Sequence, residues 1–328
     1  MKRFFTAAIC CLLLLVSVPV TVHSQQVLVP VGRIVGLHIK DDTVTVAAFD
    51  DSLGTSAREA GLKIGDQLIE IQGREIKNAQ DIQNVLYEFP EEVTVTVARG
   101  GKRKTLQFAP CQSPSGPRLG VYLRQGISGI GTVTWYDPNT GRFGTLGHGV
   151  SSRQGMLIRL SEGCIYSAQV ASVIPGKSGQ PGLLKGNADG DREIGTLYRN
   201  SPQGVFGKTR NPWPGQVLPV AAFSEIHPGQ AVIRSTVAGD HPEDYSVEIL
   251  KIYPEDREDC RNFLLKVTDA RLLTATGGIV QGMSGSPIIQ NGKLVGAVTH
   301  VFVNDPRRGY GISIGDMLKS AGIEKDAA

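Results

Sequence analysis

Short, alternating apolar runs separated by glycine and proline turns recur along most of this chain and constrain its fold more than any other feature. Glycine supplies 40 of the 328 residues, well above the usual share of about 7%. Strands this short between such turns predict a β-barrel or β-sandwich rather than a helix bundle. In the second half of the chain the runs lie at residues 131–135, 168–174, 230–234, 247–252 and 294–299.

The charge balance argues against a nucleic-acid partner. The formal net charge is only +3, and no block of five or six like charges occurs. Nucleic-acid binding needs a basic patch or stripe, which this composition does not provide. The 41% apolar content excludes wholesale disorder.

The first 24 residues have the pattern of an export signal. Lys2 and Arg3 precede a nearly unbroken apolar run over residues 4–20, and residues 22–24 form a small-x-small cleavage site. The run is also about as long as the shortest membrane-spanning helices, so retention as an N-terminal anchor is the alternative. Either way, we expect the remaining chain to lie outside the membrane that it crosses.

Residues 30–108 predict one small domain with strands at 43–47 and 93–97 and a helix at 78–86. The segment at residues 57–73, AREAGLKIGDQLIEIQG, resembles bacterial PDZ domains. That resemblance implies a peptide bound as an added strand beside a carboxylate-accepting loop. Because the loop sequence is not the standard one, a PDZ fold with a blunted groove stays open. The residues expected in the loop are Arg33, Ile34, Val35, Gly36 and Leu37.

Composition also suggests where this unit ends. Residues 109–117 are rich in proline, serine and glycine and predict a linker to a second unit at 118–318, with a tail at 319–328. The thiols of Cys111, Cys164 and Cys260 are odd in number, and nothing in their spacing indicates a pairing. There is no CxxC and no paired-histidine spacing, so we expect neither a metal nor a cofactor.

The chemistry is concentrated in residues 277–287, GGIVQGMSGSP. Ser284 lies between Gly282 and Gly285, and glycines allow a sharp turn that exposes a serine hydroxyl. We predict that Ser284 is a nucleophile and that the backbone N–H groups of Gly282 and Ser284 form an oxyanion hole. The alternative is an ordinary Gly/Ser turn.

A serine nucleophile needs a base, and the base needs an orienting acid. His148 has a glycine on either side, which suits an exposed, positioned imidazole; the alternative is a buried structural histidine. His300 lies on a strand predicted to form a substrate wall with Thr299 and Val301. Spacing alone does not choose the acid: the candidates are Asp269, 15 residues before Ser284, and Asp189, Asp191, Asp240, Asp244 and Asp305.

Four segments together resemble the stage IV sporulation protein B family, the PDZ-containing serine peptidases of endospore-forming bacteria. They are FGTLGH at 143–148, Thr268-Asp269, the serine segment at 277–287, and THVFVNDP at 299–306. The resemblance implies Ser284 as nucleophile, His148 as base and Asp269 as acid. It also implies a mainly β protein, with an α+β PDZ domain followed by a chymotrypsin-like double β-barrel.

The resemblance further implies a signalling role without a cofactor. Family members are exported from the forespore into the space between forespore and mother cell. There they cleave themselves and a membrane-bound regulator of an intramembrane protease that activates a late sigma factor. The PDZ unit is expected to bind peptide segments. Two alternatives remain: a non-catalytic PDZ adaptor, and an envelope quality-control peptidase of the HtrA type, in which the PDZ follows the protease.

Overall fold

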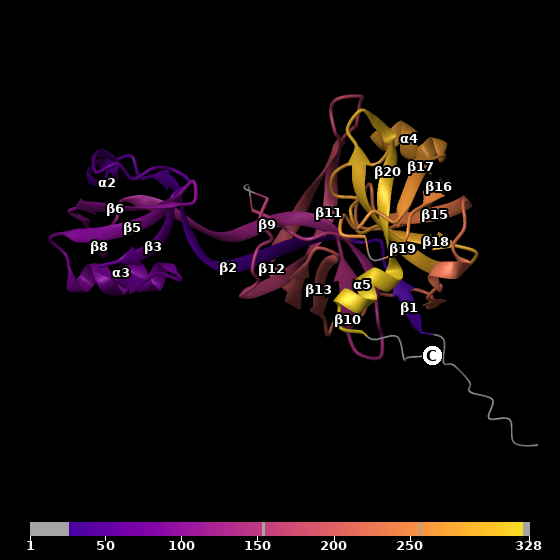
Figure 1. The fold of residues 1–328 in the computed structure, drawn as a ribbon, viewed down its shortest axis with the longest axis horizontal. Coiled ribbons are helices and arrows are strands. Elements are labelled where there is room, and N and C mark those ends of the chain that lie inside the picture. Colours follow the sequence, from indigo (N-terminus) through magenta and orange to yellow (C-terminus); the bar gives the residue numbers. More distant parts are fainter. Residues whose placement is uncertain (1–25, 153–154, 256, 324–328) are drawn as a thin grey trace, which may run out of the picture.

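Two closed β-barrels lie side by side, and a smaller unit projects from the first of them on a two-stranded ribbon (Figure 1). The computed structural model describes residues 26–152, 155–255 and 257–323. The predicted leader at 1–24 and the end of the predicted tail lie outside the described residues. Within the described ranges, no helix is both long enough and apolar enough to cross a bilayer.

The first barrel closes because β9 pairs with both β2 and β10, completing a six-stranded antiparallel ring. Its core contains Val133, Phe143, Ile165 and Val205, each fully buried. The ring strands are β2 (Ile34–Phe49), β9 (Val121–Tyr136), β10 (Arg142–Thr145), β13 (Gly204–Lys208), β12 (Leu183–Ser201) and β11 (Glu162–Ile174). Two short strands extend it beyond β9: β1 (Val27–Pro30) and β14 (Leu218–Pro219).

The second barrel is also a closed ring of six strands. Its core strands alternate inward apolar and outward residues, as in Phe263, Leu265 and Val267. The ring consists of β15 (Gly229–Ser235), β16 (Glu243–Ile252), β17 (Phe263–Val267), β20 (Asp305–Ser313), β19 (Lys293–Phe302) and β18 (Pro287–Gln290). The helical segments of this half are η1 (Phe223–Glu225), α4 (Ala270–Thr276) and α5 (Ile314–Ser320). The predicted double β-barrel is confirmed.

The projecting unit has its own core and the predicted α+β content. In the helix α3, Asn78 caps the N-terminus in a capping box with Asp81, and Ile82, Val85 and Leu86 face the core. The predicted strands at 43–47 and 93–97 and the predicted helix at 78–86 are confirmed. The remaining elements are α2 (Thr55–Glu59), β3 (Gln67–Ile71), β4 (Arg74–Glu75), α3 (Ala79–Glu88), β5 (Val93–Arg99), β6 (Lys102–Phe108), β7 (Cys111–Ser113) and β8 (Gly116–Arg118).

The PDZ unit is inserted into the first barrel rather than preceding it. Strands β2 and β9 are each 16 residues long. Residues 34–39 of β2 pair inside the barrel with β9 and β11, whereas residues 44–49 pair inside the PDZ unit with β9 and β3. The chain therefore crosses between the two units twice, along one continuous ribbon (Figure 1).

This arrangement corrects the expected boundaries. The barrel begins before the PDZ unit, and the segment expected to be a linker forms the β7–β8 hairpin, which lies against α3. At the junction, Gly126 has φ +79°, and a Cβ there would lie 2.0 Å from the Ile39 carbonyl oxygen. The ribbon can pass through this point only with a glycine in that position.

Candidate active site

The predicted nucleophile lies at the point where the two barrels meet. Ser284 follows α4 and precedes β18, in a loop held to β19 by two backbone hydrogen bonds: Gly285 N–H to the Val298 carbonyl at 2.8 Å, and Val298 N–H to the Ser286 carbonyl at 2.9 Å. The Ser284 hydroxyl donates to the Thr299 carbonyl at 2.8 Å. The nucleophile therefore rests on the predicted substrate wall.

Ser286, the other serine of the segment, has a structural environment. Its side chain is fully buried, and its Oγ lies 2.9 Å from Ser235 Oγ. A peptide carbonyl from solvent cannot reach a hydroxyl in that position. Of the two serines, only Ser284 is partly exposed.

His148 follows β10 on a strained turn that points it toward the second barrel. Leu146 and Gly147 both have left-handed backbone angles, with φ of +69° and +66°. A Cβ on Gly147 would lie 3.0 Å from the Thr299 methyl group, so the turn packs directly on β19. The His148 ring lies beside the His300 ring, with centroids 5.3 Å apart. The fold thus places His148, Ser284 and the wall residues in one region.

The tautomer of His148 follows from its hydrogen bond. Its Nδ1 lies 3.0 Å from the Gly149 carbonyl oxygen, which can only accept, so Nδ1 carries the proton and Nε2 keeps its lone pair. Burial lowers the pKa of His148 below its ordinary value, although the Gly149 contact opposes this. Desolvation also lowers the pKa of His300, and the nearby His148 adds to the effect. Both rings are therefore neutral at pH 7.

The backbone beside Ser284 offers two free donors. Among the described residues, the structure records no acceptor for the N–H groups of Gly282 and Ser284. Gly282 has φ +99°, a conformation that favours glycine. These are the donors that the sequence predicted for an oxyanion hole.

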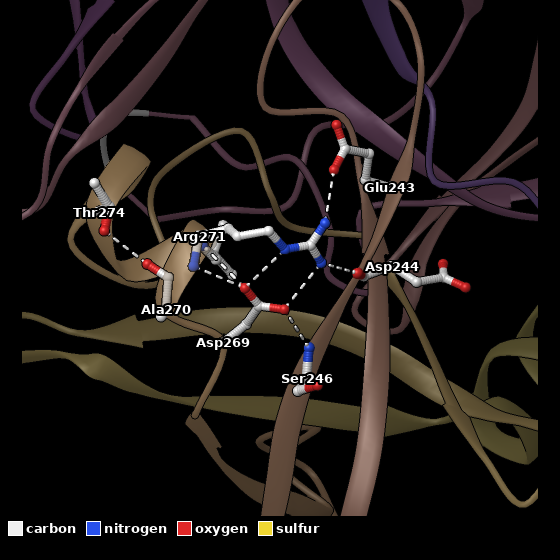
Figure 2. Close-up of polar contacts among 8 residues, drawn as sticks. Glu243, Asp244, Ser246, Asp269, Ala270, Arg271 and Thr274 are labelled. Atoms are coloured by element: carbon white, nitrogen blue, oxygen red, sulfur yellow. Dashed lines mark hydrogen bonds and ion pairs between the residues drawn. The ribbon is translucent and has the colours of Figure 1, made fainter.

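Asp269 has partners other than His148 (Figure 2). It is the N-cap of α4: its Oδ1 accepts from Arg271 N at 2.8 Å, and its Oδ2 accepts from Ser246 N at 3.2 Å. The Arg271 guanidinium adds bonds to both carboxylate oxygens. These contacts hold the pKa of Asp269 at about 2, chiefly through Arg271. Among the described residues, the structure records no hydrogen bond between Asp269 and His148, so the orienting role of Asp269 stays a prediction.

The expected PDZ loop is also placed differently. Ile34, Val35, Gly36 and Leu37 are barrel residues of β2, paired with β9 on one edge and, from Val35 onward, with β11 on the other. Arg33, just before the strand, lies 3.7 Å from the Asp240 carboxylate. With both strand edges occupied, these backbone N–H groups cannot receive a peptide carboxylate.

The structure also contains a side chain that the sequence did not single out. Asn200 of β12 holds the loop that follows His148. Its Oδ1 accepts from Val150 N at 2.9 Å, and its Nδ2 donates to the carbonyls of Val150 and Ile158, both at 2.8 Å. An asparagine near the end of a strand carries no signal for this role, because its partners lie about 40–50 residues earlier.

Neither a metal-binding cluster nor a disulfide is found among the described residues. Over residues 26–323, apart from the gaps, no group of three His, Cys, Asp or Glu side chains is arranged to hold a metal ion. The described cysteines, Cys111, Cys164 and Cys260, are free thiols.

Comparison with known families identifies this arrangement. A model of the SpoIVB peptidase S55 family matches residues 116–318, more than half of the chain. The chain belongs to the SpoIVB peptidase S55 family. A PDZ domain model matches residues 35–109. Residues 35–39 of β2 match the PDZ model, but in the structure they are part of the first barrel.

Individual relatives match this S55 peptidase over short stretches. The putative zinc metalloprotease Atu1380 of Agrobacterium fabrum is 32% identical over 90 residues, 27% of this chain and 23% of that protein. The putative zinc metalloprotease R01501 of Rhizobium meliloti is 32% identical over 100 residues, 30% of this chain and 26% of that protein. The chain spans about a quarter of the length of these curated relatives.

Two solved structures are similar to parts of the chain. The PDZ domain of the SdrC-like protein Lmo2051 from Listeria monocytogenes is 23% identical with a TM-score of 0.22, covering 25% of this chain and 87% of that one. The active form of the Rv3671c protease from M. tuberculosis is 15% identical with a TM-score of 0.38, covering 76% of this chain and 90% of that one.

Proposed function

We propose that this S55 peptidase is an exported serine endopeptidase of sporulation signalling. It cleaves itself and a membrane-bound regulatory protein, thereby activating an intramembrane protease and late sigma-factor processing. The observation that carries the catalytic part is the position of Ser284. It lies beside two N–H donors without a recorded acceptor and donates to the carbonyl of Thr299, the residue before His300, whose ring centroid lies 5.3 Å from that of His148. The signalling part rests on family membership.

The chemistry begins with a rotation of the Ser284 hydroxyl from the Thr299 carbonyl toward Nε2 of His148. Nε2 takes the hydroxyl proton as Oγ attacks the scissile carbonyl. The N–H groups of Gly282 and Ser284 then stabilise the negative oxygen of the tetrahedral intermediate. The imidazolium gives the proton to the leaving amine. Water then attacks the acyl-enzyme while His148 takes its proton, and His148 returns that proton to Ser284 Oγ as the acid product leaves.

The substrate would lie along β19. Pairing of β19 with β18 ends at Ala297, so residues 299–301 present an edge that no described strand covers. An extended peptide can add to such an edge through backbone hydrogen bonds. Its N–H group would take the place of the Ser284 hydroxyl on the Thr299 carbonyl, freeing the nucleophile as the substrate binds.

The PDZ unit would bind a second peptide segment, at β9 rather than at residues 33–37. Residues 121–124 pair with β2 on one edge, and no described strand covers the other. Helix α3 runs beside this segment in the opposite direction: Tyr87 bonds to the Ser115 carbonyl, Gln83 to the Pro117 carbonyl, and Gln125 to the carbonyl just before α3. An edge strand beside a helix is the setting in which PDZ domains take up peptides.

Location follows from the leader. We place the enzyme across the forespore membrane, in the intermembrane space, with residues 1–24 as a cleaved signal or a transient anchor. A tagged full-length chain, followed by fractionation and N-terminal sequencing, distinguishes the two. Recovery of the whole chain in the cytoplasm would refute export.

The catalytic proposal is tested on residues 25–328 with a fluorophosphonate probe and an assay for self-cleavage. Ser284→Ala should abolish both, whereas Ser286→Ala, if folded, should keep labelling. Absence of labelling in the wild type would favour the non-catalytic adaptor. Rapid degradation of unfolded casein would instead favour a quality-control peptidase.

The signalling proposal needs a separate experiment. Co-expression with the membrane-bound regulator of an intramembrane protease should yield a discrete cleavage product that Ser284→Ala does not give. If an enzyme that labels well leaves the regulator intact, catalysis stands and the signalling role fails.

A further inference from the structure

Two loops cross beside Thr132 of β9: residues 277–286, which carry Ser284 and are called the nucleophile loop, and residues 146–150, which carry His148 and are called the histidine loop. Thr132 is fully buried. Its N–H donates to the Ser284 carbonyl at 3.1 Å, and its carbonyl accepts from Leu146 N at 3.2 Å and from Thr145 Oγ1 at 2.6 Å. Its hydroxyl donates to the Gly282 carbonyl at 2.8 Å. One residue of the first barrel thus contacts both loops.

We propose that Thr132 is a positioning residue: its hydroxyl holds the peptide unit that joins the two oxyanion donors. That unit runs from the Gly282 carbonyl to the Met283 N–H, between the N–H groups of Gly282 and Ser284. Its carbonyl is held by the Thr132 hydroxyl, and its N–H donates to the Val280 carbonyl at 3.1 Å. The inference rests on the proposed function, since the oxyanion role belongs to that mechanism.

Of the contacts of Thr132, only the hydroxyl bond to the Gly282 carbonyl depends on the side chain and holds this peptide unit. The backbone bonds of Thr132 survive any substitution that preserves β9. Gly282 has no Cβ to restrict its rotation and has φ +99°. Loss of the hydroxyl leaves the Gly282 carbonyl without this donor, so the peptide unit can turn and carry the adjoining N–H groups away from the oxyanion.

Thr134 provides a matched control on the same strand. It lies two residues further along β9 and is also fully buried, but its hydroxyl has no hydrogen-bond partner. Replacing either threonine by valine changes a hydroxyl to a methyl group at nearly constant volume. Only the Thr132 change removes a bond to the nucleophile loop.

The test compares Thr132→Val, Thr132→Ser and Thr134→Val in residues 25–328. We measure the rate of fluorophosphonate labelling at saturating probe and, separately, the half-saturating concentration. Thr132→Val should lower the maximal rate at least tenfold with little change in half-saturation, because the phosphonyl oxygen occupies the oxyanion site. Thr132→Ser keeps the hydroxyl and should restore most of the rate, and Thr134→Val should match the wild type.

Amide hydrogen exchange over residues 280–286 provides a readout that does not depend on activity. Exchange should be faster in Thr132→Val than in Thr134→Val. Equal labelling and equal exchange in the two valine variants would overturn the inference. If the wild type itself is not labelled, the proposed function fails, and exchange alone decides on Thr132. Should Thr132→Val not fold, Thr132→Ser against Thr132→Ala gives the same comparison.

Discussion

At the scale of single residues, the hydroxyl of Ser284 is bonded to a backbone carbonyl, and the imidazole of His148 is in the tautomer that can accept its proton. Ser284 donates to a backbone carbonyl, while His148 has its Nε2 lone pair available. In a triad, an aspartate fixes the tautomer of the base. Here the Gly149 carbonyl fixes it. The imidazole therefore needs no carboxylate to be in the tautomer that accepts a proton.

The low pKa of His148 predicts how activity depends on pH. Only the neutral imidazole accepts the serine proton, so activity falls as the pH drops through the pKa of His148. Burial lowers that pKa, and we therefore expect the midpoint of the acid limb below about 6.5. The rate of fluorophosphonate labelling between pH 4 and pH 8 measures it. His300→Gln should leave the acid limb of the pH profile unchanged. A midpoint above 6.5 would contradict the assignment of His148 as the base.

The contacts of Asp269 predict that an asparagine can replace it. Asparagine is as good an N-cap as aspartate, whereas loss of a cap to alanine costs about 0.5–2 kcal/mol. Asp269→Asn should label within tenfold of wild type, and Asp269→Ala should have the lower midpoint of thermal unfolding. A loss of about 10⁴-fold in a folded Asp269→Asn protein would instead identify a triad acid.

Low pH should weaken the contacts of Asp269 with Arg271 and with the N-terminus of α4. The pKa of Asp269 is lowered to about 2 by Arg271 and the cap, so the carboxylate stabilises the fold above its ordinary pKa of 3.8. This contribution is lost as the pH falls from about 4 toward 2. The difference in unfolding midpoint between wild type and Asp269→Ala should therefore be smaller at pH 3 than at pH 6. A constant difference would contradict the prediction.

At the scale of elements, the site depends on a close crossing of three backbone segments. Gly285 of the nucleophile loop packs on β9 and on the histidine loop. A Cβ there would lie 2.1 Å from the Thr132 carbonyl oxygen and 2.5 Å from Leu146 N. Neither contact can be relieved by a side-chain rotation, because both atoms belong to the backbone. The glycine after Ser284 thus lets the two barrels meet at the nucleophile.

Gly285→Ala should therefore abolish labelling through displacement of the nucleophile loop. Gly292, in the turn between β18 and β19, provides the control: its φ is +73°, but no atom lies within 4 Å of a Cβ built there. Gly292→Ala should incur only the left-handed strain, about 1–2 kcal/mol, and should still label. Thermal unfolding and probe labelling of both variants measure this, and an active Gly285→Ala enzyme would disprove the crowding argument.

At the scale of the whole molecule, the PDZ unit is an insertion between two barrel strands. The strand whose outer edge is proposed to bind peptide, β9, is 16 residues long and runs from the PDZ unit into the first barrel, where it carries Thr132. The junction is a two-stranded ribbon whose register shifts between Ile39 and Val44. A ligand on the PDZ unit would therefore lie on a strand that is hydrogen-bonded to the nucleophile loop.

The insertion predicts opposite results for two deletions. Removing residues 25–110 takes away β1 and the barrel part of β2, so the first barrel should not close and labelling should be lost. Excising residues 41–125 and joining the ends through an Asn-Gly turn leaves that ring intact, because Ile39 already pairs with Ile127. The excised protein should label but process protein substrates poorly. Labelling by the first deletion and not the second would refute the insertion.

Local sequence determined much of this protein. The glycine-rich turns and alternating runs predict a β protein, residues 57–73 identify the PDZ unit, and residues 277–287 predict Ser284 as the nucleophile. Each depends on neighbouring residues, through turn geometry, pleat alternation or exposure of one hydroxyl. The N-cap role of Asp269 could also be predicted from the sequence, because an aspartate directly before a short helix is an N-cap signal.

Only the tertiary structure decided where the PDZ unit sits, which strand edge it leaves open, and which side chain holds the nucleophile loop. Residues 34–39 and 44–49 are both rich in apolar residues, and no local pattern shows that the first group pairs in the barrel and the second in the PDZ unit. Likewise, Thr132 and Thr134 look alike in the sequence and are equally buried. They differ because the chain brings the carbonyl of Gly282, 150 residues later, within hydrogen-bonding distance of Thr132 alone.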